Sequence, residues 1–248
     1  MRALFNLVIF QPIFNLFVGL YALIPDVGVA IILLTVLIKI ILTPLTNKGI
    51  RAQASMAELQ PKLEGLKRQH KDNPQLLAQE TMKLYKEHKV NPVGSCLPLL
   101  IQLPVFIALY WVLQAGLANG SLDQLYSFVP NPGKINPISL GFFDLSKRSI
   151  GLAVLAGAAQ FWQAKMMVRT RPPKPTPEGA KDEDMMAIMN KQMLYMMPIL
   201  TVVIGISLPA GLSLYWFVST VLTGLQQLWL QKKHQPPTAP GVIDGKIV

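Results

Sequence analysis

Residues 27 to 45 read VGVAIILLTVLIKIILTPL, and this stretch decides how the rest of the chain can fold. It is apolar almost throughout, and about 20 apolar residues are enough to cross the hydrocarbon core of a membrane as a helix. One cation, Lys39, lies inside the stretch between Thr35 and Thr43. An ionisable side chain within a span is costly, so by default it indicates a functional site. We therefore expect a membrane span with Lys39 as its first candidate functional residue.

The composition points to a membrane protein. Of 248 residues, 51% are hydrophobic and only 15% are charged, whereas soluble domains carry about 25% charged residues. The net charge of +10 fits cytoplasmic segments of a membrane protein, which concentrate Lys and Arg. No aromatic-basic module indicates sequence-specific binding of nucleic acid. The single cysteine, Cys96, excludes an intrachain disulfide, and we expect neither a metal site nor a cofactor.

Four more apolar stretches follow the first, and we expect each of them to be a span. They cover residues 96–117, 150–168, 185–208 and 212–230. The last two are separated by Pro209, Ala210 and Gly211, which predict a tight turn. The sequence thus predicts an all-α polytopic protein with five transmembrane helices.

The segment before the first span has a different character. Residues 3 to 24 mix Asn6, Gln11 and Asn15 with Phe, Leu and Ile, a mixture that favours a helix in the membrane interface over another span. The start lacks the small-residue cleavage site of a signal peptide, so we expect this helix to be retained. Asp26 marks the edge of the first span.

A charged segment, residues 47–94, separates the first two spans. Met56, Leu59, Leu63 and Leu66 recur at helical spacing, and Leu77, Thr81, Leu84 and His88 repeat the pattern. Asp72, Asn73 and Pro74 between them predict a turn followed by a helix start. We expect an antiparallel helical hairpin outside the membrane, with Pro61 bending or interrupting its first helix.

The distribution of Lys and Arg predicts the orientation. The hairpin and the proline-rich loop around residues 169–184 are strongly basic, whereas the connection 118–149 has few basic residues. The positive-inside rule then places the N-terminus outside and both basic segments in the cytoplasm. We expect the loop to be mobile and the tail to be disordered. We expect five units along the chain. They are the N-terminal interfacial helix 1–25, the first span 26–46, the cytoplasmic helical hairpin 47–94, the remaining four spans 95–231 and the cytoplasmic tail 232–248.

The chain resembles the YidC/Oxa membrane-protein insertases. The matching runs are LLTVLIKIILTPLT (33–46), LQPKLEGLKRQHKDNPQLLAQETMKLYKEHKVNPVGSCLPLLIQLPVFIALYWVL (59–113) and PAGLSLYWFVSTVLTGLQQ (209–227). The resemblance implies five spans around a hydrophilic groove that opens to the cytoplasm, and a short form without the large periplasmic domain. The family usually has arginine where this chain has Lys39, which keeps the charge but not the fixed guanidinium geometry.

The resemblance also implies roles for individual residues. The client groove would include Lys39, Thr35, Gln102, Phe106, Tyr215 and Trp216, and the recruiting hairpin would act through Arg51, Lys62, Lys67, Arg68, Lys83 and Lys86. The implied partners are nascent membrane proteins, the ribosome, the Sec translocon, the signal recognition particle pathway and membrane lipids. The implied location is the plasma membrane of a bacterium.

Each of these assignments has a simpler alternative. Lys39 could snorkel to the interface, Gln102 could bond a neighbouring helix, and Tyr215 and Trp216 could be an ordinary interfacial pair. The hairpin could lie on a lipid surface. The methionines 186, 189, 193 and 197 share a helix face that suits varied apolar partners or ordinary packing.

Two other functional classes compete with the insertase. An intramembrane protease would need a nucleophile and a base, and no histidine lies in any expected span. No Walker-type glycine loop indicates a nucleotide-driven process. A small polytopic transporter or channel subunit stays open as the alternative, although a transporter would predict paired repeats.

Overall fold

The computed structural model describes residues 2–71, 73–115, 122, 124–169 and 192–234. Most of them are helical. The helices and π-helical turns are α1 Arg2–Phe5, η1 Asn6–Phe10, α2 Gln11–Leu23, α3 Val27–Gln69, α4 Pro74–Glu87, α5 Pro92–Leu113, α6 Ile150–Arg169, η3 Gln192–Met196, α8 Met197–Ser207 and α9 Ala210–His234. Two short strands, β1 Ile138–Ser139 and β2 Phe143–Asp144, pair antiparallel.

The first apolar stretch and the first hairpin helix form one helix. α3 has 43 residues and is therefore about 65 Å long at 1.5 Å per residue. The predicted interruption at Pro61 is wrong, because α3 continues through it. The helix also continues past residue 46, where we expect the first span to end. Leu59 and Leu63, on either side of Pro61, are 4% and 3% exposed. Their packing offsets the hydrogen bond that a proline removes from a helix.

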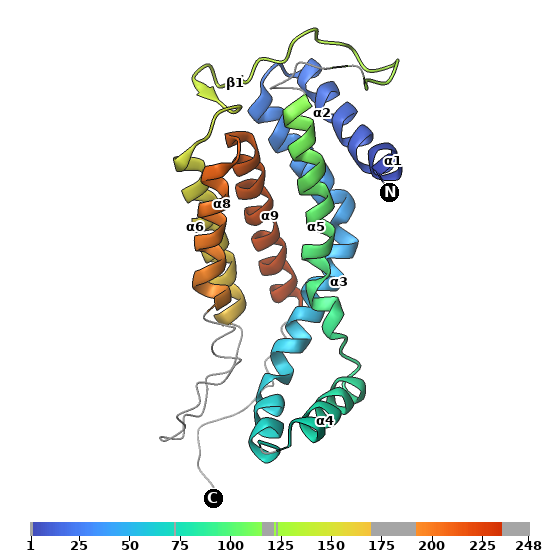
Figure 1. Ribbon diagram of the computed structural model, residues 1–248, viewed down its shortest axis with the longest axis vertical. Helices are drawn as coiled ribbons and strands as arrows, with labels where there is room; N and C mark the ends of the chain where they lie inside the picture. Colours follow the sequence, from blue (N-terminus) through green and yellow to red (C-terminus); the bar gives the residue numbers. More distant parts are fainter. Residues whose placement is uncertain (1, 72, 116–121, 123, 170–191, 235–248) are drawn as a thin grey trace, which may run out of the picture.

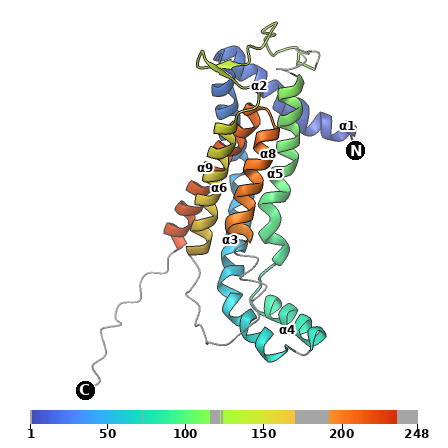
Figure 2. The same cartoon turned by 60° about the vertical axis from the view of Figure 1, so that its left-hand side comes forward.

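α2, α5, α6, α8 and α9 form a bundle with the upper part of α3, whereas α4 lies beside its lower end (Figure 1). α6 packs against α8 and α9, and α3 packs against α5 and α9 (Figures 1 and 2). α2 packs on α3 and lies obliquely across the upper end of the bundle (Figure 1). The turn between α8 and α9 is as tight as the sequence predicts, since only Leu208 and Pro209 separate the two helices.

Two helices extend beyond the predicted spans. α5 begins at Pro92, before the predicted span start at residue 96. α9 continues to His234, past the predicted span end at residue 230. Lys and His near a helix C-terminus are favourable with the helix dipole, which allows this extension. The proline-rich loop, the rest of the tail and residues 185–191 lie outside the described residues.

The outward surfaces of the bundle are apolar. Asn6–Leu23 and Val27–Met56 are long and apolar enough to cross a membrane, and Ile101–Leu113 and Leu194–Ser207 are shorter apolar helices. Large aliphatic side chains face outward, such as Ile41 on α3 (69% exposed) and Ile199 on α8 (63% exposed). Contiguous apolar surface of this kind requires an apolar surrounding.

The buried core lies at the end of the bundle that α2 covers. Phe14, Phe17 and Val18 of α2 are almost fully buried there. They belong to one cluster with side chains of α3, α5 and α9, among them Ile31, Leu34, Leu109, Val112, Leu212 and Tyr215. Ile135 and Leu145 from the connection after α5 complete the cluster. This end of the bundle is therefore closed by close-packed apolar side chains.

The connection before α6 is attached to α2 by buried polar groups. Asn15, only 3% exposed, donates to Gln124 O (3.0 Å) and accepts from Tyr126 N (2.6 Å). The Tyr21 hydroxyl accepts from Asn136 N (2.9 Å). The polarity of Asn15 is one reason to expect a helix at the membrane interface. In the structure, its side chain instead satisfies backbone groups of the connection before α6.

Asp26 links the same connection to the start of α3. Its Oδ1 accepts from Gly28 N (2.8 Å), Val29 N (3.0 Å) and Ser139 Oγ (2.6 Å), and its Oδ2 accepts from Leu140 N (2.7 Å). Burial opposes ionisation of the carboxyl, but these four hydrogen bonds outweigh it and keep its pKa below the ordinary value. The sequence did not predict the β1–β2 pair. Hydrogen bonds to Asp26, the N-cap of a distant helix, hold this pair, and no local alternation of apolar and polar side chains marks it.

The fold predicts that Asp26→Ala destabilises the protein by about 1–2 kcal/mol, as expected for the loss of an N-cap. Thermal unfolding in detergent at pH 7 measures this loss. Asp144→Ala is the matched control, because the bonds of Asp144 reach only Ser146 and Lys147 nearby in the chain. An equal loss in the two variants would contradict the linking role of Asp26.

The same cap predicts a pH dependence. Because the folded pKa of Asp26 lies below that of the unfolded chain, about 3.9, its stabilisation is complete above that value. It disappears as the pH falls through the folded pKa. The difference in melting temperature between the unmodified protein and Asp26→Asn should be constant near neutral pH and narrow on acidification below pH about 4. A melting-temperature difference that grows as the pH falls would contradict this prediction.

Candidate functional site

Lys39 lies at the centre of a polar cluster between three helices. Its Nζ donates to Thr223 Oγ1 of α9 at 2.8 Å and to Gln102 Oε1 of α5 at 3.4 Å. The Thr223 hydroxyl donates its own proton to Ser219 O (2.8 Å), so its lone pairs are available to the ammonium. α3, α5 and α9 thus meet at one level of the bundle through a single cation.

Gln102 extends the cluster toward the closed end. While its Oε1 accepts from Lys39, its Nε2 donates to the Tyr215 hydroxyl and to Ser219 Oγ (3.2 Å). Tyr215 is 2% exposed and also belongs to the apolar core. The cluster therefore begins where the packed core ends.

The ammonium is hydrogen-bonded but not neutralised. Both of its partners, Thr223 and Gln102, are uncharged. A hydrogen bond to a charged group contributes about 1.5–3 kcal/mol, and a cation at the centre of a membrane costs about 2.5–3.5 kcal/mol even on the lenient insertion scale. The two bonds can offset that cost. Thr223 and Gln102 are the hydrogen-bond partners of the ammonium among the residues that the structure describes, and an ammonium has a third N–H that can donate to another acceptor.

Three aromatic rings lie beside the cluster. The ring centroid of Phe106 is 6.4 Å from that of Tyr215 and 5.4 Å from that of Trp216, the latter edge to face. Phe106 lies four residues after Gln102 on α5, and both Phe106 and Trp216 are half-buried. The site therefore combines a cation with an aromatic surface one helical turn away.

Polar side chains continue from the cluster toward the other end of the bundle. Thr43 and Thr46 donate back to carbonyl groups of α3, to Lys39 O (2.7 Å) and Leu42 O (2.5 Å) respectively. Directly after Thr46, Asn47 Oδ1 accepts from Gln226 Nε2 of α9 (2.7 Å). The α3–α9 contact thus changes from apolar at the α2 end to polar toward α4.

The predicted hairpin residues occupy a separate part of the structure. Arg51, Lys62, Lys67 and Arg68 lie on α3, whereas Lys83 and Lys86 lie on α4; the side chain of Arg68 lies outside the described residues. Lys62 Nζ is 2.6 Å from His88 Nε2, and Lys83 pairs with Glu80 at 3.7 Å. Asn73 caps α4 by accepting from Leu76 N (3.1 Å), so the predicted helix start is confirmed.

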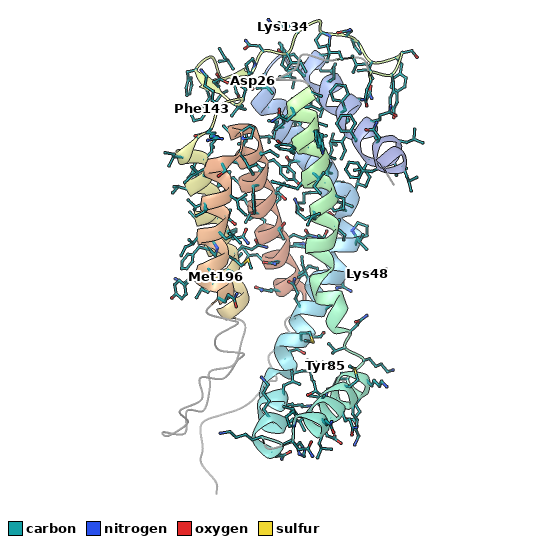
Figure 3. All side chains as sticks on the ribbon, in the orientation of Figure 1. Asp26, Lys48, Tyr85, Lys134, Phe143 and Met196 are labelled. Carbon is teal, nitrogen blue, oxygen red and sulfur yellow. The ribbon has the colours of Figure 1, made fainter. Side chains whose placement is uncertain are left out.

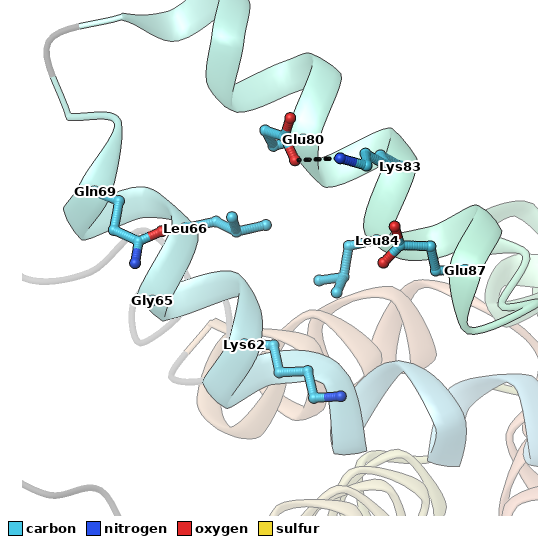
Figure 4. Close-up of a pocket in the computed structure, with 8 residues that line it drawn as sticks. All are labelled: Lys62, Gly65, Leu66, Gln69, Glu80, Lys83, Leu84 and Glu87. Atoms are coloured by element: carbon cyan, nitrogen blue, oxygen red, sulfur yellow. Dashed lines mark ion pairs between the residues drawn. The ribbon is translucent and has the colours of Figure 1, made fainter.

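A pocket of about 340 Å³ opens between the two hairpin helices. Leu66 and Leu84 point into the space between the helices, and charged side chains such as Lys62 and Glu87 lie around it (Figure 4). α4 has no buried residue. Its apolar side chains are thus only partly covered by α3.

The structure brings most of the predicted groove residues together. Gln102 bonds both Lys39 and Tyr215, the Phe106 ring lies beside Tyr215, and Trp216 lies beside Phe106. Thr35 is different, since it is 1% exposed and donates to Ile31 O (2.6 Å) within its own helix. Of the four aligned methionines, only the side chain of Met197 is described, and it is 40% exposed.

Sequence reasoning missed Ser219 and Thr223. Both contribute to the cluster from α9, four and eight residues after Tyr215. A signal was present, because polar residues repeated every four positions on an apolar helix share one face.

Comparison with known proteins places the chain in a family. Residues 19–237 match the family described as 60Kd inner membrane protein. A "Membrane protein insertase YidC" from Fusobacterium nucleatum is 38% identical over 206 residues, which cover 83% of this chain and 86% of the relative. The chain belongs to the YidC family of membrane protein insertases.

More distant YidC proteins support the assignment. The YidC of Ectopseudomonas mendocina is 36% identical across 93% of this chain, which spans only 35% of that longer relative. A solved structure described as an active YidC insertase with its first transmembrane domain resolved has a TM-score of 0.58. It is 26% identical and covers 89% of this chain and 45% of its own. The mostly helical fold is thus that of a YidC protein.

We predict that Thr223→Val reduces insertion of a small membrane protein, because it leaves Lys39 with Gln102 alone. The loss should be about tenfold if one hydrogen bond to a charged group is removed. Thr223→Ser keeps the hydroxyl and should retain activity. The measurement is insertion in cells depleted of their own insertase. Equal activity of the Val and Ser variants would show that Thr223 does not position Lys39.

Proposed function

We propose that this protein moves apolar segments of newly made membrane proteins from the cytoplasm into the lipid bilayer. The observation that carries the proposal is the position of the Lys39 cluster. The cluster lies between α3, α5 and α9. It adjoins the close-packed apolar core that closes the α2 end of the bundle. A polar pathway with one closed end suits partial entry of a chain rather than passage across the membrane.

The physical role of the cluster is to lower a solvation barrier. A polar group left unsatisfied in hydrocarbon costs several kcal/mol. Hydroxyl, amide and ammonium groups along the α3–α9 contact offer hydrogen bonds to polar residues of a client, and a hydrated groove would add water. The apolar span of the client then leaves past Phe106 and Trp216 into lipid. Burial of its surface, at roughly 25 cal/mol per Å², drives this step.

The proposed topology has five spans, formed by the upper part of α3 together with α5, α6, α8 and α9. The N-terminal helix precedes them at the membrane interface, and the groove opens to the cytoplasm. The N-terminus then lies outside, and the α3–α4 hairpin and the C-terminal tail lie inside the cell. The distribution of Lys and Arg supports this orientation. YidC relatives from bacteria support a location in the bacterial inner membrane.

The hairpin is the proposed recruiting element. Its basic residues include Arg51 and Lys67 on α3 and Lys86 on α4, and α4 with the end of α3 lies beyond the bundle (Figure 1). The pocket at Leu66 and Leu84 provides partly covered apolar surface for an incoming segment. The ribosome, the Sec translocon and the signal recognition particle pathway are the proposed partners that deliver nascent chains. Insertion breaks no covalent bond, so the proposal needs neither a catalytic residue nor a cofactor.

The sign of the charge at position 39 tests the proposal. Lys39→Arg should retain activity, whereas Lys39→Ala and Lys39→Glu should leave a folded protein that inserts poorly. Lys39→Glu should be the most defective with clients whose translocated tails are acidic, because attraction becomes repulsion. Complementation by a single-span client in insertase-depleted cells measures this.

Lys48→Glu is the matched control, because Lys48 is exposed on the same helix beyond the cluster (Figure 3). It carries the same change of charge and should complement fully. If Lys39→Ala and Lys39→Glu also complement fully, the charge has no role in insertion, and the snorkelling interpretation of Lys39 is correct.

A further inference from the structure

The β1–β2 pair carries an exposed apolar tip. Between the two strands, Leu140 is 69% exposed and Phe142 is 75% exposed, and the flanking Ile138 and Phe143 are 42% and 37% exposed. Ser139, in contrast, is turned inward and 6% exposed. Four large apolar side chains thus point away from the protein on a hairpin of only seven residues, Ile138 to Asp144.

The tip is held in an unusual backbone conformation. Leu140 has a φ of 53° and Gly141 a φ of 81°. The left-handed region is ordinary for glycine but rare for a bulky residue such as leucine. Asp26 holds this conformation by accepting from Leu140 N (2.7 Å) and from the Ser139 hydroxyl. The fold therefore fixes a strained turn whose side chains face outward.

The other side of the hairpin is fixed to the turn between α8 and α9. Gly211 N donates to Leu145 O (2.9 Å), and Ala210 N donates to Lys147 O (2.7 Å). Leu145 itself is 2% exposed in the core. With α3 on one side and α9 on the other, the tip is a rigid projection of the bundle.

The tip adjoins the apolar outer surface of the bundle. Figure 3 shows Phe143 at the side of the molecule near the start of α6, whereas Lys134 lies at the top of the molecule. α6 begins at Ile150, which is 66% exposed, and Ile206 at the end of α8 is 37% exposed. The tip therefore continues the surface that the proposed function places in lipid.

Basic side chains lie next to these apolar ones. Lys147 and Arg148 follow the hairpin directly and are both exposed. Lys147 pairs with Asp144 at 3.0 Å, and its side chain stays 80% exposed. Apolar side chains flanked by exposed cations fit the interfacial layer of an anionic membrane, where aromatic rings lie at headgroup level and Lys and Arg contact phosphate.

We propose that the tip of the β1–β2 hairpin inserts Leu140 and Phe142 into the membrane interface at this end of the bundle, with Lys147 and Arg148 on the lipid headgroups. The tip then fixes the depth of α3, and with it the depth of Lys39, because Asp26 connects the tip to the N-terminus of that helix. This inference rests on the membrane embedding in the proposed function. A bilayer is favoured over a protein partner because the tip is continuous with the lipid-facing surface and flanked by basic residues.

The test places a fluorophore at the tip of the full-length protein. Phe142→Cys in a Cys96→Ser background is labelled with an environment-sensitive dye and reconstituted in vesicles of phosphatidylcholine and phosphatidylglycerol. Lipids that carry a nitroxide near the headgroup report contact by quenching. Lys134→Cys is the control for water, and Ile41→Cys on the exposed face of α3 is the control for lipid.

We expect strong quenching at position 142, weak quenching at position 134, and a further blue shift at 142 when phosphatidylglycerol is included. If position 142 behaves like 134 while position 41 contacts lipid, the inference is wrong and the membrane embedding stands. Quenching at 142 that appears only after a protein partner is added overturns it as well. If position 41 also stays in water, both the tip and the proposed function fail.

Discussion

The hydrogen bonds of the Lys39 ammonium are the interaction around which the candidate site is built. The ammonium joins α3 to α9 through Thr223 and to α5 through Gln102, so three segments far apart in the sequence are held at one level. Among the residues that the structure describes, both hydrogen-bond partners of the ammonium are neutral. A carboxylate partner would have cancelled the positive charge, and a buried ion pair often adds little net stability.

The two ends of the bundle are built differently, and in the proposed function this difference gives insertion a direction. At one end, α2 and the connection before α6 close the bundle with aromatic and aliphatic side chains. At the other end, the α3–α9 contact becomes polar and α3 continues into the hairpin. Asp26 connects the two features, because it caps the helix that carries Lys39, about 20 Å along the axis at 1.5 Å per residue. A rigid cap at the closed end thus sets the position of the charge near the middle of α3's apolar part.

The sequence predicted the helices and most of the cluster, but not the contacts across long distances in the chain. Long apolar stretches predicted the membrane part of α3, α6 and α9, and the charge of Lys39 within such a stretch marked the site. Thr223 and Ser219 escaped notice because a hydroxyl on an apolar helix is common and bonds its own backbone at no great cost. The β1–β2 pair was missed because Asp26, more than a hundred residues earlier, holds it. Pro61 failed as a helix breaker because tertiary packing outweighed local preference.

Crosslinking of a client at the aromatic rings tests the central claim most directly. A photoreactive phenylalanine analogue at Trp216 would lie beside the Lys39 cluster, and the same analogue at Val154, which is 49% exposed on α6, would face away from it. Ribosomes stalled with one apolar segment emerging supply the client. The account predicts that the segment crosslinks to position 216 and not to position 154. Crosslinks of equal yield at both positions, or at 154 alone, would contradict it.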